Sequence, residues 1–123
     1  MLKIILADKT EVGVLSNTAI YPSMSVSNRS KMEIHLTETA MTLDAFEALF
    51  SDATKTVSMH LVDTESGSDI TYSNYSIVAS IGKKSVVTVN YQTGATATEM
   101  HLVVELEQLT YIEQQLKALN VQI

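Results

Sequence analysis

Three histidines, His35, His60 and His101, are the residues of this chain whose chemistry best suits metal binding. Each lies in a different segment of alternating apolar and polar residues, the pattern of a β-strand. If those strands were neighbours in register, the three imidazoles could form a zinc-type face. The alternation instead places each histidine at an outward position, which favours unpaired surface side chains. We therefore expect no metal site.

Catalytic motifs are not found in the sequence. There is no cysteine, which excludes thiol catalysis, thiolate metal sites and a disulfide framework. No serine lies in a Gly-x-Ser-x-Gly elbow, and neither a glycine-rich phosphate loop nor an HExxH helix is present. We expect a protein that is not an enzyme, with no catalytic residues and no cofactor.

Tyrosines give the chain one candidate ligand face. Tyr72, Asn74 and Tyr75 form the most suggestive group, because tyrosine rings bury area while keeping a hydroxyl in water. This group would suit a small binding module for a cell-surface glycan or peptide. Aromatic residues are also favoured in strands for packing alone, so both interpretations stay open.

Charge argues against nucleic acid as a partner. Fourteen acidic and eight basic residues give a net charge of −6, and the basic residues are scattered along the chain. Non-specific binding to phosphate needs clustered Lys and Arg. No segment approaches the ~18 consecutive apolar residues of a membrane span, and the N-terminal apolar run is too short for a signal peptide. We expect neither nucleic-acid nor membrane binding.

Hydrophobic periodicity predicts an α+β fold that is mainly β, an antiparallel, sandwich-like domain built from hairpins. A hairpin is expected with its two-residue turn at Asp8 and Lys9, and a clean alternation runs over residues 31–38. Residues 70–80 resemble one long strand, bent by a bulge near Asn74. Residues 82–84 resemble a turn between strands. One short helix is expected at about residues 43–51, capped by Thr42, with an apolar face that packs on the sheet.

The hydrophobic period changes from two to about 3.6 at Thr110, where Thr110 and Glu113 form a capping-box pattern. We expect a C-terminal helix at about residues 111–121, so that a β-rich domain, 1–109, is followed by a helical docking segment, 110–123. The seam that could contact a partner has helical spacing. Its members are Leu109, Ile112, Leu116, Leu119 and Ile123. The helix is too short for an isolated coiled coil, so packing on a partner and folding back on the sheet remain alternatives.

Three stretches of the chain resemble one family. They are the opening residues 3–12 (KIILADKTEV), the helical residues 42–50 (TLDAFEALF) and the closing residues 106–116 (LEQLTYIEQQL). Together they resemble the small, mostly uncharacterised proteins encoded in the tail modules of phages and prophages of Gram-positive bacteria, near the baseplate and tail-tip genes. The resemblance implies a structural or assembly component of a virion tail, made in the host cytoplasm. It would act as a homo-oligomer or with other tail and baseplate proteins, and it carries no functional residues across.

Overall fold

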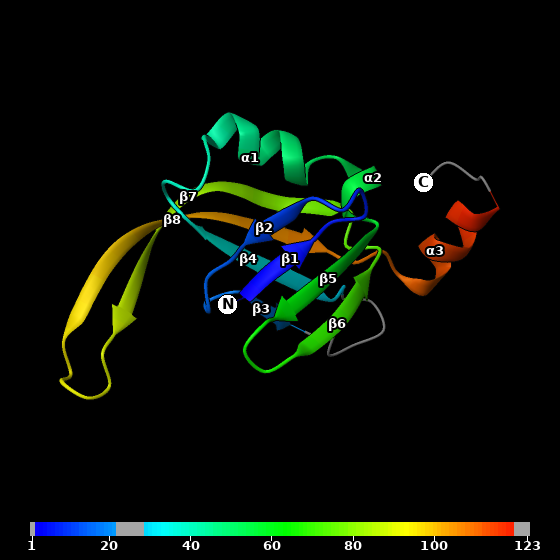
Figure 1. Ribbon diagram of the computed structural model, residues 1–123. Coiled ribbons are helices and arrows are strands. Elements are labelled where there is room, and N and C mark those ends of the chain that lie inside the picture. Colours follow the sequence, from blue (N-terminus) through cyan, green and yellow to red (C-terminus); the bar gives the residue numbers. More distant parts are fainter. Residues whose placement is uncertain (1, 22–28, 120–123) are drawn as a thin grey trace.

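The strands form two four-stranded antiparallel sheets, which confirms the expected α+β, mainly β class. The computed structural model describes residues 2–21 and 29–119 (Figure 1). Sheet A has the order β2-β1-β5-β6, and sheet B has the order β3-β4-β8-β7. The strands of sheet A are β1 (Leu2–Ile5), β2 (Glu11–Gly13), β5 (Ser58–Asp63) and β6 (Ser68–Ser73). Those of sheet B are β3 (Ala19–Tyr21), β4 (Lys31–Thr37), β7 (Ile77–Val89) and β8 (Thr96–Glu107).

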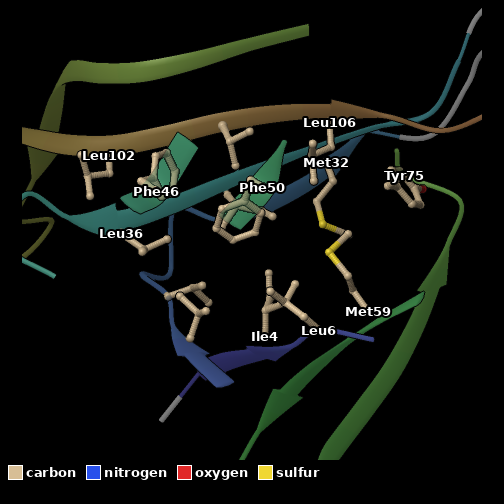
Figure 2. Packing of buried hydrophobic residues seen from close by; sticks show 14 residues of the cluster. Ile4, Leu6, Met32, Leu36, Phe46, Phe50, Met59, Tyr75, Leu102 and Leu106 are labelled. Carbon is tan, nitrogen blue, oxygen red and sulfur yellow. The ribbon is translucent and has the colours of Figure 1, made fainter. Parts of the chain in front are cut away.

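The core lies between the two sheets and is closed on one side by a helix (Figures 1 and 2). Helix α1 (Leu43–Phe50) begins where Thr42 accepts a hydrogen bond from the Ala45 amide, as the sequence predicted. Its Phe46 and Phe50 are buried between the sheets. Figure 2 shows Phe50 among side chains of both sheets, which include Ile4, Met32 and Met59. The helix therefore fills the space that two short sheets leave open.

Two predictions for the middle of the chain are wrong. Residues 70–80 are not one bent strand, because β6 ends at Ser73 and β7 begins at Ile77 in the other sheet. Asn74 makes this crossing with a positive φ of 65°, a conformation that Asn tolerates better than most residues. Residues 82–84 are not a turn, since β7 runs straight through them. A short helix, α2 (Ala53–Thr56), was not expected.

The C-terminal helix α3 (Tyr111–Ala118) follows β8 after a three-residue connection. Its capping box is confirmed, because Thr110 accepts a hydrogen bond from the Glu113 amide and the Glu113 carboxylate accepts one from the Thr110 amide. Residues 120–123, which include Ile123 and the predicted end of this helix, lie outside the described residues. None of the described helices is long and apolar enough to span a membrane.

Candidate functional site

A two-stranded arm extends from sheet B. Strand β4 pairs with β8 only as far as Thr37 opposite His101, so beyond that pair β8 is bonded to β7 alone. We call residues 85–100 the arm. Its turn is closed by the Gly94 amide, which donates to the Asn90 carbonyl at 2.7 Å. Figure 1 shows the arm reaching away from the two sheets on the side opposite α3.

The arm exposes apolar side chains. Side chains alternate between the two faces of a strand, so Met100 of β8 lies on the same face as the core residues Leu102 and Val104. Val87 and Val89 of β7 lie on this face too, because they pair with Thr98 and Thr96 of β8. Val87 is 63% exposed and Met100 is 41% exposed. Tyr91 at the turn is 94% exposed. The core-facing side of sheet B thus continues past sheet A and is left uncovered.

The arm also carries little charge, because its one charged residue is Glu99 next to His101 at the base. Residues 85–98 contain no Asp, Glu, Lys or Arg and no proline. Natural edge strands are usually protected by charged residues or proline, because their free amides and carbonyls invite pairing with another chain. An uncharged ribbon rich in β-branched residues has neither protection.

Helix α3 is held to the domain at its first turn. Arg29 donates to both carboxylate oxygens of Glu113, at 3.0 Å from Nη2 to Oε2, and it also contacts Glu107. The hydrogen bond from Arg29, followed by that from the Thr110 amide, lowers the pKa of Glu113 from 4.5 to about 2. No residue of α3 in its described range is buried. The helix is therefore fastened by polar contacts, with little apolar packing.

The seam predicted for this helix is divided by the structure. Leu109 is 7% exposed, and its amide donates to the Asn74 carbonyl at 2.9 Å, so this residue contacts its own domain. Leu116 is half-buried, whereas Ile112 and Leu119 are 69% and 73% exposed. Tyr111, which was not part of the seam, is also exposed. The apolar surface that α3 offers thus consists of Tyr111, Ile112 and Leu119.

The tyrosine group is placed mainly inward. Tyr75 is 4% exposed and belongs to the core, and burial raises the pKa of its hydroxyl. Tyr72 is half-buried and meets Tyr75 edge to face, with ring centroids 5.9 Å apart. Asn74 contributes through its backbone, which bonds to Val57 and Leu109. These residues pack the junction of the two sheets, and little ring surface is left for a ligand.

The prediction of unpaired surface histidines is wrong for His35 and His101. Both point to the outer face of sheet B, yet both are buried, and their Nδ1 atoms lie 3.0 Å apart. They alternate with core residues as expected, but they are diagonal neighbours across β4 and β8, where Val103 is opposite His35 and Thr37 is opposite His101. His60 is on sheet A, where its exposed ring contacts Asp69 at 2.9 Å. The three histidines therefore do not converge, and no group of three metal-binding side chains is present among the described residues.

One shallow hollow of about 340 Å³ lies between the sheets. It is lined by residues without titratable side chains: Leu2, Gly13, Val14, Leu15, Thr37 and Ala40. The lining offers no acid, base or nucleophile stronger than the Thr37 hydroxyl.

Comparisons of the chain with protein-family models, curated proteins and solved structures found no match.

The sequence contained one signal for the histidine pair and one for the arm. The spacing Glu-x-His occurs twice, as Glu33 with His35 and as Glu99 with His101, and it puts each carboxylate beside its imidazole on one strand face. The uncharged run over residues 85–98 marks the arm. The role of Arg29 had no local signal, because it lies 84 residues from Glu113.

Proposed function

We propose that this protein is a non-enzymatic building block that assembles through contacts with further copies or other proteins. The observation that carries the proposal is the pair of projecting elements, the arm with its uncharged residues 85–98 and helix α3, on opposite sides of one β core (Figure 1). An isolated two-stranded hairpin is marginally stable in water. Coverage by a partner strand or sheet would satisfy its free edges and its apolar face.

Helix α3 offers a second apolar surface, different from that of the arm. Helix α3 is oriented by the Arg29 contact with Glu113, while Tyr111, Ile112 and Leu119 remain exposed. Two different surfaces on opposite sides of one chain suit head-to-tail contacts, which close into rings or extend into filaments. The family resemblance of residues 3–12, 42–50 and 106–116 supports a phage or prophage tail, in its baseplate or tail-tip region, as the setting.

Mass measurement in solution tests the proposal. We expect the wild-type protein to have a mass above that of a monomer at ~100 μM, a concentration at which weak interfaces are populated. Val87→Asp on the arm and Ile112→Glu on α3 should each reduce that mass without lowering the melting temperature, because both side chains are exposed.

Ile70 provides a matched control. It is an apolar strand residue that is 51% exposed, but it lies on the edge strand β6 of sheet A, outside both projecting elements. Ile70→Asp should leave the mass unchanged. A wild-type protein that is monomeric at every concentration measured would refute self-assembly. If Ile70→Asp reduces the mass as the other two substitutions do, the arm and α3 are not the contact surfaces.

A further inference from the structure

Four side chains form a continuous row of contacts on the outer face of sheet B. Glu33 Oε1 lies 2.6 Å from His35 Nε2, and His35 Nδ1 lies 3.0 Å from His101 Nδ1. His101 Nε2 lies 3.1 Å from Glu99 Oε2. The two imidazoles meet edge to face, with planes at 89°. Nothing in the proposed assembly function requires this row.

Each contact in the row needs one proton. Two ring nitrogens at hydrogen-bond distance require a donor and an acceptor, and an ionised carboxylate accepts only from an N–H. Three contacts therefore require three protons on four ring nitrogens. Two neutral imidazoles carry two protons, so the row contains one proton more than the neutral rings supply.

The additional proton belongs on the rings. The 2.6 Å contact of His35 with Glu33 is short, as expected of a charge-assisted hydrogen bond. Glu33 and Glu99 remain partly open to water, whereas His101 is 1% exposed. An isolated buried cation would be costly, but two carboxylates flank this one.

We infer that His35 and His101 share one positive charge in the folded protein and that this pair makes the pairing of β4 with β8 at the base of the arm sensitive to pH. His101 is opposite Thr37, the last residue of β4 that pairs with β8, so the histidine pair lies where the arm leaves the sheet. Loss of the shared charge leaves a ring lone pair facing an acceptor. Addition of a fourth ring proton puts two N–H groups against each other.

Other charged groups on this face are already paired. Lys84 is opposite His101, but its ammonium reaches Ser80 at 2.9 Å and Glu105 at 3.9 Å. Lys31 also contacts Glu105, at 3.7 Å. The remaining titratable residues at outward positions of sheet B are Tyr21 on β3 and Glu107 on β8.

A metal ion is a weaker explanation for the converging Nδ1 atoms. Zinc sites use three or four protein ligands, whereas Glu33 and Glu99 contact the Nε2 atoms and no group of three metal-binding side chains converges among the described residues. A shared proton needs only the two rings.

Proton counting gives the direction of the pH dependence. Histidine in an unfolded chain changes charge near pH ~6.5. Above that pH the folded pair holds one more proton than the unfolded chain, so its contribution to the folding equilibrium constant falls about tenfold per pH unit. Below it, the unfolded chain holds one more, and the contribution rises about tenfold per unit as pH increases. Stability from the pair is therefore greatest near pH ~6.5.

Nitrogen-15 NMR of labelled histidine in the wild-type protein tests this directly. At about pH 7.5, one unit above the unfolded transition, we expect three protonated nitrogens of four in the pair. His60, on the other sheet, serves as an internal reference for the assignment of the ring nitrogens. Two protonated nitrogens of four in the pair would overturn the inference.

Unfolding against pH provides the second measurement. The wild-type protein and His60→Gln should both show the maximum, whereas the double substitution of His35 and His101 by Gln should remove it. If the double variant does not fold, the nitrogen count still decides. Zinc-dependent stabilisation that is lost in His35→Gln would instead identify a metal pair and refute the shared proton. Because these readouts use the single protein without a partner, failure here is distinct from failure of the assembly proposal.

Discussion

Leu109 and Ile112 belong to one predicted seam, but the structure gives them opposite surroundings, which leads to a sharp prediction. We consider Leu109→Ala and Ile112→Ala, two truncations of aliphatic side chains three residues apart. If the seam were one docking surface, both would be neutral for folding. If the helix folded back on the sheet, both would be destabilising.

The structure predicts an unequal pair. Leu109 is 7% exposed, and truncation of a buried leucine to alanine lowers the free energy of unfolding by about 2–5 kcal/mol. Because Leu109 lies at the edge of the core, beyond the end of β8, we expect a loss of about 2–3 kcal/mol. Ile112 is 69% exposed, so its truncation should change the free energy of unfolding by less than about 0.5 kcal/mol.

Urea unfolding followed by tyrosine fluorescence and far-ultraviolet circular dichroism measures both values. Leu119→Ala, at a position 73% exposed, is the control for a second exposed seam residue. The slope of the free energy of unfolding against urea concentration should be the same in all variants, since the surface exposed on unfolding hardly changes. Equal losses for Leu109 and Ile112 would refute the division of the seam and with it the exposed face of α3.

Three further predictions concern the core and the junction of α3. Thr110→Ala removes an N-cap and should cost about 1 kcal/mol of helix stability, visible as faster amide exchange over residues 111–118. The pKa of Glu113 is lowered to about 2, so its contact with Arg29 contributes fully above the unfolded value of 4.5 and is lost as pH falls through about 2. A carboxyl carbon titration should show this, and Arg29→Met should raise the pKa of Glu113 only part of the way toward 4.5, because the Thr110 amide still donates to its carboxylate. Phe50→Ala should cost about 3–5 kcal/mol in urea unfolding, because its ring is 1% exposed between the sheets. A cost below 1 kcal/mol would contradict the packing in Figure 2.

Local signals predicted the elements whose contacts are close in sequence. Thr42 caps α1, and Thr110 with Glu113 caps α3, because a cap joins residues only three apart. The alternation over Lys31–Thr37 likewise matches β4. The errors lie where neighbours are distant. Gly82 and two lysines resemble a turn, but pairing with residues 101–103 of β8 keeps that segment in strand.

Sequence alone therefore determined the fold class, the two capped helices and the absence of cysteine chemistry. Tertiary structure alone decided which apolar residues are covered: Leu109 is buried and Ile112 exposed, although both fit one helical seam. It also decided that His35 and His101 form a pair, since an outward position on a strand specifies a face but not the partner across it. Periodicity is a property of one segment, whereas burial and pairing depend on which segments the chain brings together.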